Sequence, residues 1–345
     1  MKLKDIAKLA NVSPATVSMV LNDRPGVSNA KREQILQLLD EYGYSVHASS
    51  DVPAATSQLC RNLRLIKCKR HAMLVDGNPG FVNAIVDAIE LECRRQGLEL
   101  MITTCSIEQL HTVIRQIRAE TTAGILLLGT ELSTSDVQAM PVSVVPMIIL
   151  DSAPHLSDVS CITMDNYDAI YCAVDHLVSY GHKQIGFFAN QYPANNCLER
   201  ERAFPEALRR HNLVFDPNIV YRVHPTPDGA YQSVREMLAN GVHFPSAMVA
   251  NNDSIALGAI KAMKEAGLDI PGDVSVVGFD NIPLSSITDP PLTTMDVPCN
   301  EMGIWAVRLL CDRIKYPSSS SIKMQLSTKL LVRSSTTYCN SKRRL

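Results

Sequence analysis

The chain has 345 residues, more than one hydrophobic core usually serves, so two or three domains are expected. Hydrophobic residues make up 46% and charged residues 20%, with a net charge of −2, as in ordinary soluble globular proteins. No apolar run is long enough to span a membrane, and the N-terminal Met-Lys-Leu-Lys-Asp is not a signal sequence, so we expect a cytoplasmic protein without membrane contact.

Two short helical patterns open the chain, at residues 3–10 and 14–22, with a tight corner at Asn11 and Val12 between them. Ser13 is a good N-cap, and Pro14 stands where the missing N–H would have had no helical partner. The spacing predicts a helix-turn-helix. Residues expected to face inward are Ile6, Leu9 and Ala10 from the first helix and Val17, Val20 and Leu21 from the second.

The second helix begins with small and hydroxyl side chains, which suit insertion into the major groove of DNA. A third helix over residues 29–42 completes the head, with a buried stripe of Ile35, Leu38, Leu39 and Tyr42. The predicted DNA-binding residues of the head are Lys4, Ser13, Pro14, Ala15, Thr16, Ser18, Met19, Asn22, Ser28 and Lys31. The alternative is a small three-helix bundle without a role in DNA binding.

The charge distribution favours the DNA-binding interpretation. Residues 1–71 carry eleven Lys and Arg against six Asp and Glu, a net charge of +5, whereas the rest of the chain has a net charge of −7. Basic residues near a helix-turn-helix supply affinity for phosphate that falls with salt. The residues expected to contact phosphate are Lys2, Lys4 and Lys31 and the cluster of Arg61, Arg64, Lys67, Lys69 and Arg70.

From Ala72 onward, short apolar runs alternate with amphipathic helices, which predicts an α/β core of two doubly wound parallel sheets. The predicted strands are residues 72–75, 98–104, 124–128, 147–150, 185–189, 247–250 and 274–279. The predicted helices are residues 81–95, 106–119, 168–180, 199–210, 229–238, 253–266 and 300–313.

Polar residues cluster where these strands end. The clusters are Asp76-Gly-Asn78, Asp151-Ser152, Asn190-Gln191, Asn251-Asn-Asp253 and Asp280-Asn281. Because ligands of open parallel sheets bind beyond the carboxyl ends of the strands, two such sheets are expected to hold a small polar molecule between them.

Ten cysteines are present without a Cys-x-x-Cys pair or a His spacing suited to zinc. We therefore predict reduced, mostly buried thiols, with no disulfide, no metal and no cofactor.

Five motifs, in this order along the chain, together resemble one known family. They are Val12-Ser-Pro-Ala-Thr-Val-Ser-Met-Val-Leu-Asn22, Asp175-His-Leu-Val-Ser-Tyr-Gly-His-Lys-Gln-Ile-Gly186, Ala250-Asn-Asn-Asp-Ser-Ile-Ala-Leu-Gly-Ala259, Val277-Gly-Phe-Asp-Asn281 and Pro290-Pro-Leu-Thr-Thr-Met295. The chain resembles the lactose-repressor/galactose-repressor family of bacterial transcription regulators over essentially its whole length.

The resemblance implies a DNA-binding head, a hinge, a two-lobed core like that of periplasmic sugar-binding proteins, and a homodimer that reads a near-palindromic operator. The boundaries expected are residues 1–46 for the head, 47–71 for the hinge and 72–345 for the core. Within the core we expect lobe 1 at about 72–163 and 291–320, and lobe 2 at about 164–290 and 321–335.

The resemblance also implies an effector site that suits a sugar. The candidate effector-binding residues are Phe81, Asp151, Asn196, Arg200, His224, Asn252, Asp253 and Asp280. Carboxylate, amide and guanidinium groups pair with vicinal hydroxyls, and a flat side chain covers the apolar face of a ring. The alternative for Arg200 is a surface salt bridge to Glu199 or Glu201.

Two departures from the family concern DNA binding. Met19 stands where many relatives have a hydrogen-bond donor, which leaves only apolar contact, for example to a thymine methyl. The hinge sequence is also atypical, so we predict a helix from Pro53 to about Arg64 that forms on DNA, with Leu59 or Leu63 inserted between base pairs. The alternative is a flexible linker.

The predicted function is a sequence-specific transcriptional regulator, a repressor by resemblance alone, controlled by a small sugar-like effector. A sugar-processing enzyme or a secreted sugar-binding protein shares the two-lobed core. No nucleophile motif, phosphate loop or signal peptide supports either of these, and neither explains the basic head.

Overall fold

The computed structural model describes residues 7–21, 27–28, 31–35, 38, 61–155, 157–192 and 194–339, without the side chains of residues 15, 18 and 21. The chain forms two compact units, residues 1–58 and 59–345.

The described part of the N-terminal unit consists of short helical segments joined by turns. Residues 7–9 and 31–35 are helical, and α2 spans Pro14–Leu21. The N-cap is as predicted, because the Ser13 Oγ accepts a hydrogen bond from the Thr16 backbone N–H at 3.1 Å. The core of this unit contains Ala7, Ala10, Val17, Val20 and Ile35.

One predicted core position of the head is wrong. Leu9 is 49% exposed, since Ala7 and Ala10 of the same segment take the inward positions. The predicted core residues Ile6, Leu39 and Tyr42 lie outside the described residues.

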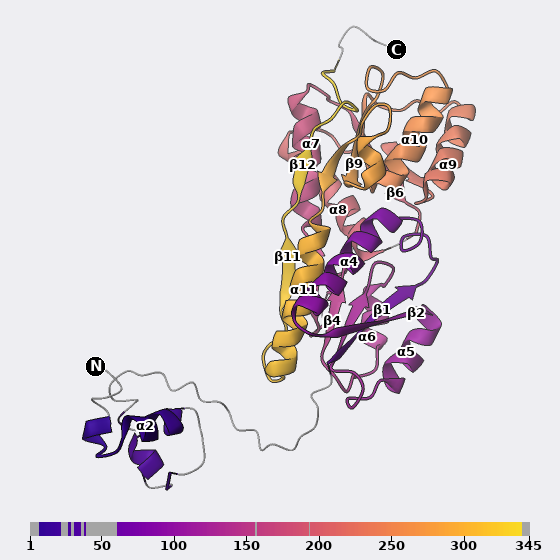
Figure 1. The fold of residues 1–345 in the computed structure, drawn as a ribbon. Coiled ribbons are helices and arrows are strands. Elements are labelled where there is room, and N and C mark those ends of the chain that lie inside the picture. The colour runs from indigo at the N-terminus through magenta and orange to yellow at the C-terminus, as the bar shows by residue number, and fades with distance from the viewer. Residues whose placement is uncertain are drawn as a thin grey trace. The chain divides into compact units, whose positions relative to one another are not determined.

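The larger unit contains two lobes, each built on a six-stranded sheet (Figure 1). The strands of lobe 1 are all parallel, in the order β11-β5-β4-β3-β1-β2. They are β1 (Asn62–Lys69), β2 (Glu99–Ser106), β3 (Gly124–Leu128), β4 (Met147–Leu150), β5 (Ser160–Met164) and β11 (Lys323–Leu326). The helices of this lobe are α4 (Pro79–Arg95), α5 (Ile107–Gln116), α6 (Thr134–Ala139) and α11 (Cys299–Lys315).

Alternate residues of the strands in lobe 1 serve two separate cores. Leu126 and Leu128 of β3 pack with α4 and α11, whereas Ile125 and Leu127 pack with α5. Each fully buried side chain of this size stabilises the fold by about 1.5–3 kcal/mol. At Gly303 of α11, an added Cβ would lie 2.7 Å from the Ala88 Cβ of α4, so the two helices need a glycine to pack this closely.

Lobe 2 has the strand order β12-β10-β9-β8-β6-β7, parallel except for β12. Its strands are β6 (Ile185–Asn190), β7 (Val220–Val223), β8 (Ala247–Ala250), β9 (Ser275–Asp280), β10 (Thr293–Asp296) and β12 (Lys329–Leu331). Its helices are α7 (Asn166–Ser179), α8 (Asn195–Arg210), α9 (Pro227–Ala239) and α10 (Asp253–Glu265), with short 3-10 helices at Pro217–Ile219 and Pro283–Ser286.

The chain crosses between the lobes three times, from β5 to α7, from β10 to α11 and from β11 to β12 (Figure 1). The predicted lobe boundaries are wrong at the last two crossings. The strand β10 belongs to lobe 2 because it pairs with β9, and β11 belongs to lobe 1 because it pairs with β5. Only strand pairing assigns these short segments to a lobe, and pairing cannot be read from their sequence.

The predicted hinge helix is wrong over residues 62–64. These residues begin β1, which pairs with β2 and β3 in the interior of the sheet. Leu63 is fully buried there, so it cannot insert between base pairs, and Leu59 lies outside the described residues. The prediction of a linker at residues 47–71 is therefore also wrong over 62–69.

The predicted first strand, residues 72–75, is a turn. Its backbone N–H groups do not pair with a neighbouring strand. Those of Ala72, Leu74 and Val75 donate instead to the Glu131 carboxylate, at 2.8–3.2 Å. Nearby, Lys69 pairs with Asp76 and Arg70 with Asp136, so these two predicted phosphate contacts are neutralised within lobe 1.

No helix among the described residues is both long enough and apolar enough to cross a bilayer.

Candidate functional site

A polar cleft lies between the two lobes, at the carboxyl ends of their strands, where parallel sheets usually bind ligands. The residues that line it are Leu74, Asn78, Phe81, Thr130 and Asp151 from lobe 1 and Ala194, Asn196, Cys197, Arg200, Asn252 and Asp280 from lobe 2. Six of the eight predicted effector-binding residues are in this set, namely Phe81, Asp151, Asn196, Arg200, Asn252 and Asp280.

Glu131 shapes the wall that lobe 1 contributes to the cleft. Its carboxylate accepts backbone N–H groups from residues 70–75, at distances between 2.6 and 3.2 Å. Although burial opposes ionisation, these hydrogen bonds hold the pKa of Glu131 below its usual value. The charged carboxylate thus fixes the loop that positions Leu74 and Asn78 in the cleft.

Arg200 projects from α8 and is held on several sides. Its Nε donates to the Asn166 Oδ1 at 2.8 Å, and its Nη1 donates to the Asn251 carbonyl at 2.7 Å. The guanidinium also lies 3.5 Å from the centre of the Phe279 ring. The alternative of a surface salt bridge is wrong, because Arg200 is buried and the charge nearest to its Nη1 is Asp280, at 4.0 Å.

Asp280 ends β9 and links the lobes across the cleft. Its Oδ2 accepts a hydrogen bond from the Asn78 Nδ2 of lobe 1 at 2.7 Å. The backbone of Asp280 has a φ of +112°, a conformation that L-residues rarely adopt. Such strain commonly marks functional positions, where the surrounding structure holds a side chain in place.

Asp151 forms a second link between the lobes. Its Oδ2 accepts from the Thr130 hydroxyl at 2.7 Å, and its Oδ1 accepts from the Asn196 Nδ2 of lobe 2 at 2.6 Å. Asp151 also has a positive φ, of +58°, immediately after β4. The two lobes are thus joined by two amide-to-carboxyl hydrogen bonds that run in opposite directions, because each lobe supplies one amide donor and one carboxyl acceptor.

The two cleft carboxyls are costly to ionise. Burial raises the pKa of Asp151 to about 6 and that of Asp280 to about 7, and the nearby Arg200 only partly offsets this. In addition, the Asn78 Oδ1 is buried and has no hydrogen-bond partner in the described part of the chain. The cleft is therefore rich in hydrogen-bond acceptors. A ligand that donates hydrogen bonds to them would bind most favourably.

Two predicted effector residues lie outside the cleft-lining set. Asp253 is fully buried, and its carboxyl accepts from the Thr294 hydroxyl at 2.6 Å and the Ile282 N–H at 3.0 Å. Its role is to hold α10 to the chain after β9, while burial, followed by repulsion from Asp280, raises its pKa to about 8. His224 packs edge-on against Tyr192 and pairs with the Thr226 hydroxyl.

Sequence reasoning missed five cleft residues, Leu74, Asn78, Thr130, Ala194 and Cys197. Asn78 had a usable signal, because it belongs to one of the polar clusters noted at the predicted strand ends. The other four carry no pattern that distinguishes them from neighbouring loop residues.

The candidate DNA interface is the N-terminal end of α2. Ser13 and Pro14 are exposed there, and the hydroxyls of Ser13 and Thr16 lie 2.9 Å apart. Met19 is half-buried, Ser28 is exposed, and the half-buried Lys31 donates to Gln34. Lys4 and Asn22 lie outside the described residues, as do the side chains of Ala15 and Ser18.

Comparisons with known protein families match both parts of the chain. Residues 2–46 match the bacterial regulatory proteins of the lacI family, and residues 174–336 match a periplasmic binding protein-like domain.

Relatives and solved structures agree with these matches over nearly the full length. The HTH-type transcriptional repressor PurR of Aliivibrio salmonicida is 31% identical over 91% of this chain and 92% of its own. The PurR repressor of Pasteurella multocida is 29% identical over 96% of this chain and 98% of its own.

Two solved structures are similar in fold and sequence. A complex of the transcriptional regulator CelR with cellobiose has a TM-score of 0.71 at 25% identity, covering 97% of this chain and 99% of that one. The lac repressor dimer bound to operator and the anti-inducer ONPF has a TM-score of 0.71 at 26% identity, covering 98% and 99%. The chain therefore belongs to the LacI family of bacterial regulatory proteins.

Proposed function

We propose that this chain is a transcriptional repressor whose affinity for operator DNA is set by a neutral, hydroxyl-rich effector bound between its lobes. The observation that carries the proposal is the pair of hydrogen bonds that joins the lobes inside the cleft, from Asn78 to Asp280 and from Asn196 to Asp151. A ligand that replaces these bonds changes the relative stability of the closed and open arrangements of the lobes. Such a differential interaction is what an effector needs to shift a conformational equilibrium.

The electrostatics of the cleft favour an uncharged effector. Burial raises the pKa of Asp151 to about 6 and that of Asp280 to about 7, so near neutral pH their partial negative charge offsets the single buried cation Arg200 and an anionic ligand gains no net attraction. A sugar hydroxyl can donate to either carboxylate or to the free Asn78 Oδ1, while Phe81 offers an apolar surface. The cellobiose in the CelR complex is a ligand of this chemical class.

Operator recognition is assigned to the N-terminal end of α2. Exposed Ser13 and Pro14 begin this helix, and a helix N-terminus carries both free N–H groups and a partial positive charge that suit phosphate. We also propose a homodimer, the form named for the related lac repressor structure. Two copies of the head would read two half-sites of one operator. We accordingly propose that the protein acts in the cytoplasm, at the chromosome.

Catalysis is not part of this function. This part of the proposal rests on the similar proteins named above, which are repressors and regulators.

A ligand screen on the full-length protein tests the proposal. Thermal unfolding is measured with neutral sugars, nucleobases and sugar phosphates in parallel. A true effector at a hundred times its dissociation constant adds about 2.7 kcal/mol to the free energy of unfolding. Stabilisation by neutral sugars alone supports the assignment, whereas stabilisation by nucleobases or by sugar phosphates, with none from sugars, would contradict it.

A further inference from the structure

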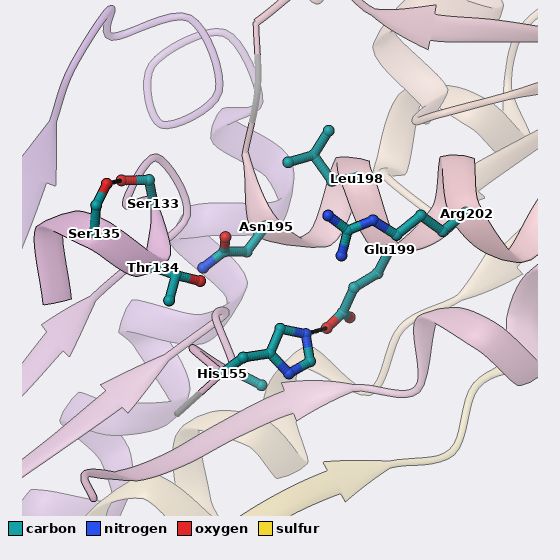
Figure 2. Close-up of a pocket in the computed structure, with 9 residues that line it drawn as sticks. Ser133, Thr134, Ser135, His155, Asn195, Leu198, Glu199 and Arg202 are labelled. Carbon is teal, nitrogen blue, oxygen red and sulfur yellow. Dashed lines mark hydrogen bonds and ion pairs between the residues drawn. The ribbon is translucent and has the colours of Figure 1, made fainter. Parts of the chain in front are cut away.

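Polar contacts between the lobes separate the effector cleft from the surface on the side of α6 and α8. A cavity of about 250 Å³ lies on that side, and it shares no lining residue with the cleft (Figure 2). Asn195 lines this cavity, and its Nδ2 donates to the Ser152 Oγ at 2.9 Å. Asn196, the next residue, lines the cleft and donates to Asp151. A ligand that arrives from this side has to break both hydrogen bonds.

A smaller pocket adjoins the cleft elsewhere, and we call it the vestibule. Leu74 of lobe 1 and Ala194 of lobe 2 line both the vestibule and the cleft, so the two spaces share a wall. These two residues pack with Cys197 as a small apolar cluster. The shared wall therefore consists of apolar side-chain contacts rather than hydrogen bonds between the lobes. The remaining residues of the vestibule are Arg70, His71, Met73, Glu131 and Tyr192.

Aromatic rings bridge the two lobes at the vestibule. The ring centres of His71 from lobe 1 and Tyr192 from lobe 2 are 4.7 Å apart. Tyr192 also packs edge-on against His224 of its own lobe, with ring centres 5.6 Å apart. Within the described part of the chain, the Tyr192 hydroxyl forms no hydrogen bond. A ring contact is weaker than a hydrogen bond to a charged group, so this bridge opens more easily than the bonds inside the cleft.

The two sides of the ring contact differ in how firmly they are held. The backbone N–H groups of His71 and Leu74 both donate to the Glu131 carboxylate at 2.8 Å, which fixes the loop of lobe 1. On the other side, the Tyr192 backbone N–H donates to the Asn190 Oδ1 at 2.9 Å. This bond anchors the backbone just after β6 and leaves the ring free to turn about its side-chain bonds. The ring of Tyr192 is therefore the part that can move aside.

We propose that Tyr192 is the gate residue of the effector cleft. Its ring closes the vestibule against His71, and small molecules reach the cleft when the ring turns away. The inference rests on the proposed function, because it assigns this route to the effector. A gate of this kind sets the rates at which a ligand enters and leaves.

Cys197 reports on the gate without an identified effector. Its thiol lines the cleft, and burial raises its pKa, so a thiol reagent reaches and alkylates it only when the cleft opens. The full-length protein is treated with iodoacetamide, and alkylation of each cysteine is followed by peptide mass spectrometry. We expect Tyr192→Ala to speed alkylation of Cys197 by about 2- to 10-fold, the change in an opening equilibrium when one aromatic contact is lost. Cys161, which is fully buried in lobe 1, should keep its slow rate.

Two further variants distinguish a local gate from general loosening of the lobes. Tyr192→Phe keeps the ring and loses only a hydroxyl without a described partner, so Cys197 should react as in the wild type. Asn195→Ala is the matched control, because it removes a contact between the lobes on the side of α6 and α8. It should also leave the rate at Cys197 close to that of the wild type.

The proposal is overturned if Cys197 of Tyr192→Ala reacts at the wild-type rate, or if it reacts equally fast in Tyr192→Phe or Asn195→Ala. It is also overturned if Cys161 is accelerated as much as Cys197, since the whole fold then opens. Each of these results leaves the proposed function standing. Conversely, the absence of a sugar effector contradicts the proposed function and does not alter the alkylation of Cys197.

Discussion

The ionisation of Asp280 makes the stability of the ligand-free protein depend on pH in a defined direction. Burial raises the pKa of this carboxyl from an ordinary 3.8 to about 7 in the folded state. The folded protein therefore holds a proton on Asp280 in a pH range where the unfolded chain has already lost it. A raised pKa contributes stability that is fully present below pH 3.8 and is lost as the pH rises through 7.

The size of this effect follows from the pKa difference. Each pH unit between the two pKa values changes the free energy of unfolding by about 1.4 kcal/mol. Between pH 5 and pH 8, Asp280 alone should therefore destabilise the fold by about 2–3 kcal/mol. Asp151 changes stability in the same direction up to about pH 6, and Asp253 does so up to about pH 8.

The variant Asp280→Asn isolates this contribution, because it keeps an acceptor for Asn78 and removes only the titrating group. Urea unfolding of both proteins at pH 5, 6, 7 and 8 gives the difference directly. We expect the wild type to lose about 2–3 kcal/mol more than the variant over this range. Parallel profiles would refute the reasoning, since they would mean that Asp280 is already ionised at pH 5.

Three further variants test the site, the head and the strand β1. Arg200→Ala should weaken effector binding by about 10- to 100-fold through loss of charged hydrogen bonds, and leave operator affinity unchanged, as calorimetry and anisotropy would measure. Thr16→Ala should weaken operator binding without changing effector affinity; equal operator affinity in the variant would remove α2 from the DNA interface. Leu63→Ala should lower the free energy of unfolding by about 2–5 kcal/mol, because the side chain is fully buried in β1, and should leave DNA bending unchanged. A bending defect in a variant of full stability would restore the wedge hypothesis.

The interior of the fold was predictable where strands consist of continuous apolar runs. The predicted bounds of β3, β4 and β8 agree with the structure residue for residue. Such strands are covered on both faces, so nearly all of their residues are apolar and the run is visible in the sequence. The strand β5 and the short strands β7, β10, β11 and β12 were missed because their polar residues break the apolar pattern.

The strand β1 shows a different kind of failure. Leu59 and Leu63 are four residues apart with arginines beside them, which fits a helix as well as a strand. Only pairing with β2 and β3 settles the choice in favour of a strand, and that pairing involves residues far away in the sequence. Tertiary contacts thus overrode a local pattern that had two valid interpretations.

Part of the candidate site could be predicted because the carboxyl ends of strands carry Asp151, Asn252 and Asp280, whereas Phe81, Asn196 and Arg200 were assigned by the family resemblance. Two predicted residues, His224 and Asp253, do not line the cleft, and Asp253 directly follows the cleft residue Asn252 at the start of α10. The Asn252 side chain accepts the Ile255 N–H as an N-cap beside the cleft, whereas Asp253 turns inward to Thr294. Adjacent residues at a helix N-terminus point to different sides, and the sequence does not say which one faces the ligand.

The most direct test of the account is the affinity of the full-length protein for its operator, with and without a neutral sugar that stabilises the fold. An operator selected from random DNA by the protein itself supplies the probe for fluorescence anisotropy. We predict that the sugar changes operator affinity by at least about fivefold, the usual lower bound of allosteric coupling, and that Arg200→Ala abolishes this response. A sugar that binds tightly to the cleft and leaves operator affinity unchanged would contradict the account.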